Sequence, residues 1–298
     1  MLKRFFPSKL ISRIAFTPPP AQADRSGLAI VLTARDEASD IAEWADFHLR
    51  AGIAHVYLYD DGSTDDTVAI LRGVLGARLT VTPWHQRPRD GDRGTEIHNQ
   101  VMAYVHAVSN YGPRHRWMAC IDADEFLVPT QANSLLEALE PLSDCPVISL
   151  PWHNFGRNGH MTRPKGGIVQ NYTKRVANPM SNVRGVTNFK NIFDPARVNM
   201  MHVHSVRTDL GSDVFNDAGQ RFALKDRKSP AFYSTAAIQL NHYYTRSEEE
   251  LAAKISKGAT FDAAAQEHAR RVRRAVANIE AEEVTDTVAQ SFLARIAS

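Results

Sequence analysis

The feature that most constrains the fold is a regular alternation of short apolar runs with helical patterns between residues 28 and 150. The run LAIVLT at 28–33 is continuously apolar, which is typical of a strand buried on both faces of a sheet. Because parallel strands need crossover helices, the alternation predicts an α/β fold with a mostly parallel central sheet flanked by helices. The expected strands cover residues 28–33, 54–59, 78–81, 117–121 and 147–150, and the expected helices cover 37–50, 66–72, 96–110 and 134–139.

The rest of the chain is less regular. Residues 1–26 read as a basic tail followed by a Pro-rich linker, and the pattern weakens from Pro151 to about Asp194. A strand at 198–206 and a helix at 248–257 are expected further on, and the Ala-rich segment 261–298 is expected to be a helical extension. We therefore expect one main domain over residues 27–260, with halves at about 27–130 and 131–260.

The charge balance excludes some classes of protein. Lys plus Arg number 35 and Asp plus Glu number 33, a net charge of +2, so we expect no nucleic-acid binding through overall charge. The two cysteines lack the spacing of a metal site or disulfide scaffold. With no long apolar run and no signal-peptide core, a cytoplasmic location is expected. Peripheral membrane attachment through the basic tail or the run HARRVRR at 268–274 stays open, against the simpler interpretation of a disordered tail and a solvated helix face.

Acidic side chains follow three of the predicted strands. The segments are TARDE at 33–37, DDGSTDD at 60–66 and DADE at 122–125. Because ligands of open α/β sheets bind at the carboxyl ends of the strands, these residues are expected to share one edge. Asp65 and Asp66 are explained by helix capping, whereas Asp60 and Asp61 precede the cap and suit hydrogen bonds to a nucleobase or ribose.

Asp122 and Asp124 are separated by one residue directly after a buried strand. Paired carboxylates at such a position can hold a divalent cation, and hard oxygen ligands favour Mg²⁺ or Mn²⁺. The cation would act as a Lewis acid on a diphosphate leaving group.

These three motifs, taken in order, resemble the signatures of GT-A nucleotide-sugar glycosyltransferases, most closely the family 2-like and family 92 group. The later segments KNIF at 190–193, HVH at 202–204 and NHYY at 241–244, with Ser247 and Lys254, also resemble that group. The resemblance implies a GT-A (Rossmann-like) fold, a nucleotide-binding half at 27–130, an acceptor-side half at 131–260, and inversion at the transferred sugar. It implies transfer from a nucleotide-diphosphate donor, expected to be a UDP-sugar, to a glycan or other hydroxyl acceptor.

Residue roles follow from the same resemblance together with the strand-end positions. Donor contacts are expected from Thr33, Ala34, Arg35, Asp36, Asp60, Asp61 and Asp122. Asp122, Asp124 and His204 are expected to hold the metal, and Trp152, Lys190 and His242 to lie on the acceptor and diphosphate side. In a strand at 198–206, His202 and His204 would share one face; a hydrogen-bonded pair explains them equally well. Aromatic packing would likewise explain His242.

Between Cys145 and Phe193 the chain has no Asp or Glu and seven Lys or Arg. This imbalance indicates either anion recognition or basic side chains that pair with acids elsewhere. The segment therefore also lacks the acidic residue that usually serves as the general base of an inverting transferase in this part of the chain. Asp194 and His153 are the expected candidates for that base, with His160 and Glu125 as further possibilities.

Two other functions are also compatible with parts of the sequence. A nucleotidyltransferase on a similar sheet would also pair carboxylates with a metal, but the loop after the first strand lacks the glycines expected there. A non-catalytic sugar-nucleotide or glycan-binding module would explain the absent base. Within the helix at 96–110, His98, Asn99 and Gln100 are interpreted as incidental to an amphipathic helix rather than as donor contacts.

Overall fold

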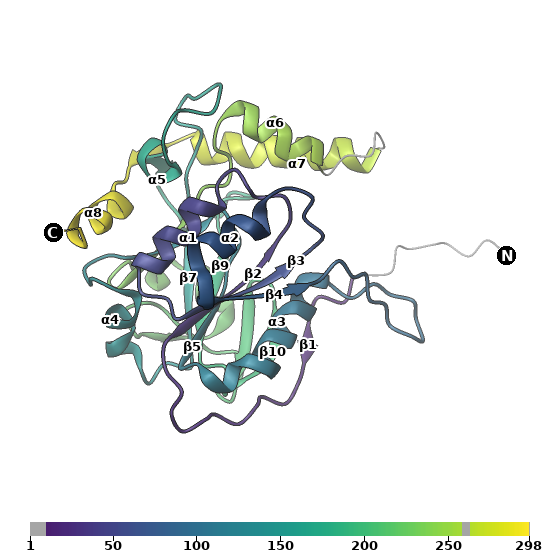
Figure 1. Ribbon diagram of the computed structural model, residues 1–298. Helices are drawn as coiled ribbons and strands as arrows, with labels where there is room; N and C mark the ends of the chain where they lie inside the picture. The colour runs from purple at the N-terminus through teal and green to yellow at the C-terminus, as the bar shows by residue number, and fades with distance from the viewer. Residues whose placement is uncertain (1–9, 258–262, 298) are drawn as a thin grey trace.

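A computed structural model describes residues 10–257 and 263–297 (Figure 1). Its central sheet has ten strands, ordered β13-β12-β7-β9-β5-β2-β3-β4 with β14 and β6 attached beside β7. β4, β3, β2 and β5 are mutually parallel, β9 runs antiparallel between β5 and β7, and β7 is parallel to β12 and β14. The strands are β2 (Leu28–Ala34), β3 (His55–Asp60), β4 (Leu79–Pro83), β5 (Trp117–Cys120), β6 (Glu125–Pro129), β7 (Val147–Asn154), β9 (Phe189–Phe193), β12 (Val214–Phe215), β13 (Arg221–Phe222) and β14 (Ile238–His242).

Helices cover both faces of this sheet (Figure 1). On one face α1, α4 and α8 pack over a core that includes Trp44 and Phe126. On the other face α3 packs over a second core that includes Tyr59 and Tyr104. The helices are α1 (Ile41–Arg50), α2 (Thr67–Leu75), α3 (Asn99–Tyr111), α4 (Leu135–Leu139), α5 (Ile168–Asn171), α6 (Glu248–Lys257), α7 (Ala263–Glu280) and α8 (Val288–Arg295). Helices on both faces of a mostly parallel sheet confirm the predicted fold class.

Two small sheets lie outside the central one. β1 (Ile14–Ala15), β10 (Val198–His202) and β11 (Ser205–Thr208) form the first, and β8 (Lys174–Val176) pairs with β15 (Glu283–Thr285) in the second. The expected tail and linker at 1–26 thus contributes a strand within its described part. The C-terminal segment, helical in α7 and α8, also returns a strand to β8. Residues 258–262, where the boundary at 260 was expected, lie outside the described residues.

Four expected elements differ from those found. The helices expected from residues 37 and 96 begin at Ile41 and Asn99, because strand-end loops extend further into the sequence than the apolar spacing shows. The strand expected to end at residue 150 continues as β7 through Pro151 to Asn154. It continues because its pairing with β9 and β14 extends over these residues. The strand expected at 198–206 is a hairpin of β10 and β11. No helix among residues 10–257 and 263–297 is both long and apolar enough to cross a membrane.

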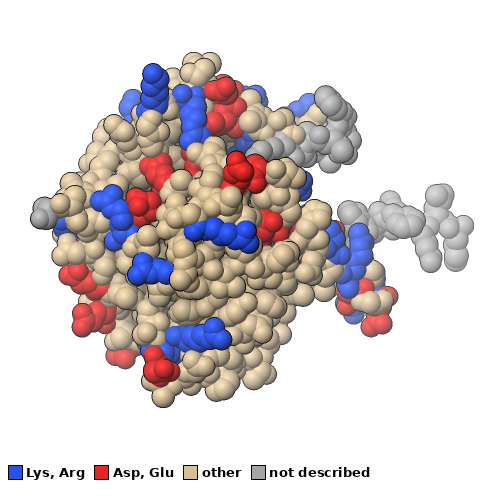
Figure 2. Space-filling view, in the orientation of Figure 1, with Lys and Arg blue, Asp and Glu red and all other residues tan. Residues whose placement is uncertain are grey.

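Basic and acidic side chains are interspersed on the face shown in Figure 2, without a continuous patch of one sign. This distribution fits the net charge of +2, and mixed charge is ordinary for a solvated surface.

Candidate functional site

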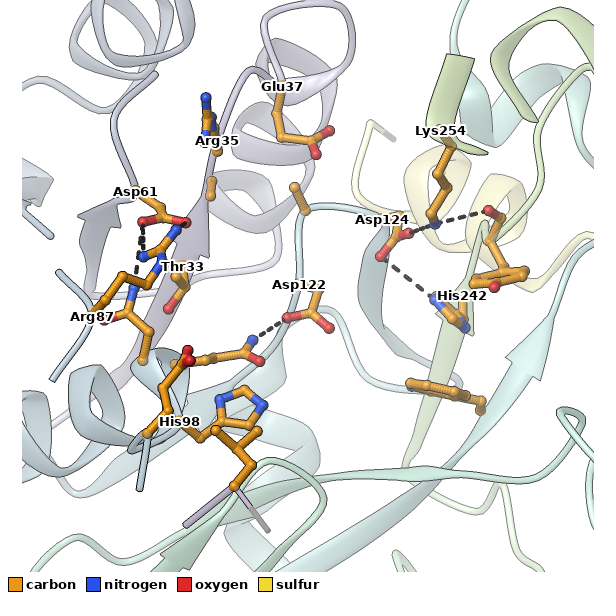
Figure 3. A pocket seen from close by; sticks show the side chains of 18 residues that line it. Thr33, Arg35, Glu37, Asp61, Arg87, His98, Asp122, Asp124, His242 and Lys254 are labelled. Atoms are coloured by element: carbon orange, nitrogen blue, oxygen red, sulfur yellow. Dashed lines mark hydrogen bonds and ion pairs between the residues drawn. The ribbon is translucent and has the colours of Figure 1, made fainter. Parts of the chain in front are cut away.

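A cavity of about 670 Å³ opens at the carboxyl ends of β2, β3 and β5 (Figure 3). It is lined by Thr33, Ala34 and Arg35 from the end of β2, by Asp61 after β3, and by Asp122 and Asp124 after β5. The three acidic strand ends predicted to share one edge therefore do so. Opposite walls come from the start of α3, from the end of β14 and from α6.

One end of the cavity is built from Thr33, Asp61, Arg87 and Asn99. Arg87 donates two hydrogen bonds to the Asp61 carboxylate, at 2.9 and 3.2 Å. Within the described part of the chain, the buried atoms Thr33 Oγ1 and Asn99 Oδ1 have no hydrogen-bond partner. Buried polar atoms are normally paired, so this end is suited to a ligand with a polar edge.

Asp60 and Asp36, both expected to contact the nucleotide, do not line this cavity. Asp60 Oδ1 accepts the Ser63 backbone N–H at 3.1 Å and closes the turn after β3. Asp36, with a left-handed φ of 53°, accepts the Thr64 backbone N–H at 2.7 Å, which lowers the pKa of its carboxyl. Both side chains brace the strand-end loops through Oδ1, and their expected contact with the nucleotide stays a prediction.

Asp122 is held from two sides. Gln100 Nε2 donates to Asp122 Oδ1 at 2.7 Å, and Lys190 Nζ donates to Oδ2 at 2.9 Å. Lys190 is fully buried and lies 3.5 Å from Glu125 as well. It therefore positions Asp122 from behind and does not line the cavity, contrary to its expected place on the acceptor and diphosphate side.

Glu125 is fully buried beneath this group. Its carboxyl accepts the Asp122 backbone N–H at 2.7 Å and the Trp152 indole N–H at 2.5 Å. Burial raises the pKa of Glu125 to about 8, against the opposing effect of the Lys190 ammonium. Because Glu125 does not line the cavity, the possibility that it acts as the general base is not supported.

Asp124 and His242 face one another at the other end of the cavity (Figure 3). His242 Nε2 lies 3.5 Å from Asp124 Oδ1, and Lys254 Nζ donates to Asp124 Oδ2 at 3.0 Å. Although burial opposes ionisation, the Lys254 ammonium holds the pKa of Asp124 well below its usual value. The Trp152 ring, also lining the cavity, lies against His242 with ring centroids 4.1 Å apart.

The hydrogen bonds of His242 define its tautomer. The Nδ1 atom lies 2.7 Å from Asn154 Oδ1, and Asn154 is oriented by donating its Nδ2–H to the Val186 carbonyl. Nδ1 therefore carries the proton and donates. Burial lowers the pKa of the His242 imidazole, so the neutral ring directs an Nε2 lone pair toward Asp124.

His204 does not line the cavity, although its ring lies edge-on to that of the lining residue Trp152, with centroids 5.4 Å apart. It lies in the turn between β10 and β11, and its Nδ1 is 3.1 Å from the Phe189 carbonyl oxygen. The shared strand face expected for His202 and His204 is wrong, because the chain reverses at this point. In the described residues, no three His, Cys, Asp or Glu side chains gather in a way that could hold a metal ion.

The candidate bases lie away from the cavity. Asp194 pairs with Arg25 and with Arg116 (3.1 Å) at the opposite end of the sheet. His153 is fully buried against Tyr233, at 3.1 Å from its hydroxyl, and burial lowers the pKa of the imidazole to about 3. His160 lies near the Asn171 carbonyl oxygen. Each of the three residues lies away from the sheet edge at the cavity, and none lines the cavity. None of them is therefore retained as a candidate for the general base.

Four of the seven basic residues between Cys145 and Phe193 pair with acids elsewhere in the chain. The pairs are Arg157 with Glu248 and Glu280, Arg163 with Asp40 and Glu250, Arg175 with Asp286, and Lys190 with Asp122 and Glu125. Most of the basic side chains of this segment therefore form ion pairs with other parts of the fold and are not available to bind an anion.

The start of α3 lies at the cavity, which its interpretation as a plain amphipathic helix does not predict. His98, Asn99 and Gln100 all line the cavity, and Gln100 bonds Asp122. Three consecutive polar residues at the beginning of a crossover helix are the signal that could have shown this, because that helix end lies near the sheet's ligand-binding edge. Tyr244, from the NHYY segment, also lines the cavity, as do Arg87 and Leu10, for whose positions local sequence contains no sign.

The chain matches the model of glycosyltransferase family 92 over residues 31–278. A family 92 protein of rice is 27% identical over 56% of this chain, and one of castor bean is 24% identical over 51%. The matched segments amount to 28% and 27% of those two proteins, so the chain spans about a quarter of the relatives it matches.

Solved structures that match part of the chain include glucosyl-3-phosphoglycerate synthase of Mycobacterium tuberculosis. The complex of that protein with Mn²⁺, UDP and glucosyl-3-phosphoglycerate has 22% identity and a TM-score of 0.28, with 45% of each chain covered. The complex with Mg²⁺ and UDP has 20% identity and a TM-score of 0.31, covering 60% of this chain and 63% of that one. Scores at this level place no individual residue.

Proposed function

Because this chain belongs to glycosyltransferase family 92, we propose that it transfers a sugar from a nucleoside-diphosphate donor to a hydroxyl group of an acceptor. The observation that carries this proposal is the polarity of the 670 Å³ cavity. Its Asp61–Asn99 end offers hydrogen-bonding groups for a nucleobase, and its Asp124–Lys254 end offers the charges that a diphosphate needs. Asp122 lies between them, where its carboxylate can accept a ribose hydroxyl.

The side chains at the diphosphate end fit a divalent cation. The His242 Nε2 lone pair and the Asp124 carboxylate are both acceptors, and a cation between them would satisfy both. One imidazole nitrogen and carboxylate oxygens suit Mn²⁺, and Mg²⁺ accepts the carboxylates with water and phosphate oxygens. When bound, such an ion neutralises charge on the departing diphosphate. We propose Asp124 and His242, with Asp122 nearby, as its ligands in place of the expected His204.

The chain's own residues supply the remaining functions. Gln100 and Lys190 hold Asp122 in one orientation, and Asn154 holds His242 in one tautomer. Lys254 places an ammonium at the diphosphate end, where it stabilises negative charge as the nucleotide leaves. We propose a UDP-sugar as the donor and inversion as the stereochemical course, on the family resemblance of the strand-end motifs.

Calorimetric binding of UDP, with and without Mn²⁺, tests this function. We expect Mn²⁺ to tighten UDP binding at least tenfold in the wild type and to have no effect on Asp124→Asn. Asp46→Asn, a change at an exposed carboxylate on α1, is the matched control and should behave as the wild type. Failure of UDP to bind under either condition would contradict the proposal. Metal-dependent UDP binding without release of UDP from any UDP-hexose would favour a non-catalytic binding module.

A further inference from the structure

A second cavity, of about 210 Å³, adjoins the first. The two share Glu37, Asp124, Tyr244 and Lys254 as common lining residues, and three of these side chains are seen together in Figure 3. The second cavity extends from this shared wall between the loop before α1 and the start of α6. Any molecule held there would lie directly beside the proposed diphosphate end of the donor site.

The lining of the second cavity is polar and nearly balanced in charge. Arg163 and Arg246 both pair with the buried Asp40, and Arg163 also pairs with Glu250 at 3.1 Å. Arg246 has a left-handed φ of 51°, and its buried Nε has no hydrogen-bond partner within the described residues. A strained residue with an unsatisfied donor is a feature of ligand sites. Since its cations already have carboxylate partners, this lining suits a neutral, hydroxyl-rich ligand better than an anion.

Its size limits the ligand further. Drug-sized ligands occupy cavities of about 300–1,000 Å³, so a cavity of 210 Å³ suits one small polar unit such as a single monosaccharide ring. Ala253 and Ser39 are both exposed and line the cavity, so it is accessible from solvent.

We propose that this second cavity is the acceptor subsite, that it binds one monosaccharide unit, and that Glu37 is the general base. This inference rests on the proposed glycosyltransferase function. In the reaction, the acceptor oxygen forms a bond to the anomeric carbon of the donor while the bond from that carbon to the diphosphate oxygen breaks. The electron pair of the broken bond leaves with the nucleoside diphosphate, and the acceptor's proton passes to the Glu37 carboxylate.

The Glu37 carboxylate lies where the proposed donor site and the proposed acceptor subsite adjoin. It lines both cavities, and its side chain points toward the space beside Asp122 and Asp124 in Figure 3. Of the four acids that line the second cavity, only Glu37 and Asp124 also line the first, and Asp124 is the proposed cation ligand. A base must reach the hydroxyl it deprotonates, and Glu37 lies on the boundary where acceptor and donor would meet.

The acceptor subsite is tested with a blocking substitution and its matched control. Ala252 and Ala253 are adjacent exposed residues of α6, and only Ala253 lines the cavity. Methyl glycopyranosides of glucose, galactose and mannose are offered to protein saturated with UDP and Mg²⁺, and binding is read by saturation-transfer NMR. We expect at least one glycoside to bind the wild type and Ala252→Trp, and its signal to fall at least fivefold in Ala253→Trp.

UDP affinity, measured on each variant, separates this inference from the proposed function. If UDP binds normally and no glycoside binds, or if Ala253→Trp binds glycoside as Ala252→Trp does, the second cavity is not the acceptor subsite. If UDP itself fails to bind the wild type, it is the proposed function that fails.

The role of Glu37 is tested by the release of UDP from UDP-hexoses in the presence of a glycoside that binds. We expect Glu37→Gln to lower kcat by about 10²–10⁴-fold while KM for the glycoside stays within threefold, because a base acts on the transition state and hardly on binding. The acidic limb of the pH–rate profile should also disappear. A kcat within threefold of the wild type, or an unchanged acidic limb, would overturn the assignment.

Discussion

The protonation of Glu125 offers a direct test of how the site is built. This carboxyl is fully buried under the cavity floor, with Asp122 and Asp124 nearby in sequence and Lys190 at 3.5 Å. Burial is the largest influence on it and raises its pKa from 4.5 to about 8. The folded protein therefore holds a proton on Glu125 over a pH range in which the unfolded chain has released it.

The size of the effect follows from the pKa difference. At about 1.4 kcal/mol per pH unit, a rise from 4.5 to about 8 corresponds to roughly 5 kcal/mol of stability. Because the folded-state pKa is the higher one, this stabilisation is fully present below pH 4.5. It is lost progressively as the pH rises to about 8, and the contribution is constant above that.

Glu125→Gln removes the titration and keeps the shape of the side chain. Its amide replaces one of the two oxygens that accept from Trp152 and Asp122, which costs about 1–3 kcal/mol independently of pH. Urea denaturation of wild type and variant between pH 4.5 and 9 gives the difference in free energy of unfolding. We expect the wild type's advantage over the variant to fall by several kcal/mol across this range.

A difference that stays flat from pH 4.5 to 8 would show that Glu125 titrates at its ordinary value, and the reasoning from burial would be refuted. A wild-type advantage that grows with pH would show that Lys190 and the two N–H donors outweigh burial, so that Glu125 is ionised in the folded protein.

Three further predictions concern the same region. Lys190→Met should lower the free energy of unfolding by about 3 kcal/mol in urea titrations, because it removes the buried ammonium that pairs with the Asp122 carboxylate, and Asp122→Asn added to it should restore part of the loss. His242→Gln should remove the Mn²⁺ dependence of UDP binding in calorimetry while leaving metal-free binding within threefold; a retained dependence would exclude it as a ligand. Leu10→Asp, on the cavity wall, should weaken UDP binding about tenfold through repulsion of the diphosphate, whereas Leu136→Asp on exposed α4 should not.

The sheet could be predicted because its signal is local. A continuous apolar run such as residues 28–33 can be buried on both faces, and the helices between the runs show apolar residues at helical spacing. Element ends were predicted less well, since strand-end loops such as the one before α3 continue the helical pattern without being helical.

The acidic strand ends were predicted as a group and not individually. Parallel strands bring their carboxyl ends to one edge, so Asp61, Asp122 and Asp124 meet in one cavity. Asp60 and Asp61 are adjacent in sequence, and the turn after β3 sends only Asp61 into the cavity. The side-chain direction depends on backbone angles at the turn, which composition and spacing do not specify.

The sequence by itself determined the parallel strands β2 to β5, the ligand-binding edge and the acids that follow those strands, because alternation and strand polarity are properties of neighbouring residues. Only the tertiary structure decided which distant groups join them. His242 reaches Asp124 because β14 lies between β6 and β7, whereas His204 and Asp194 are carried elsewhere by a hairpin and by the reversed direction of β9. Such contacts depend on strand order and direction across the whole sheet, and these are set by packing rather than by any local pattern.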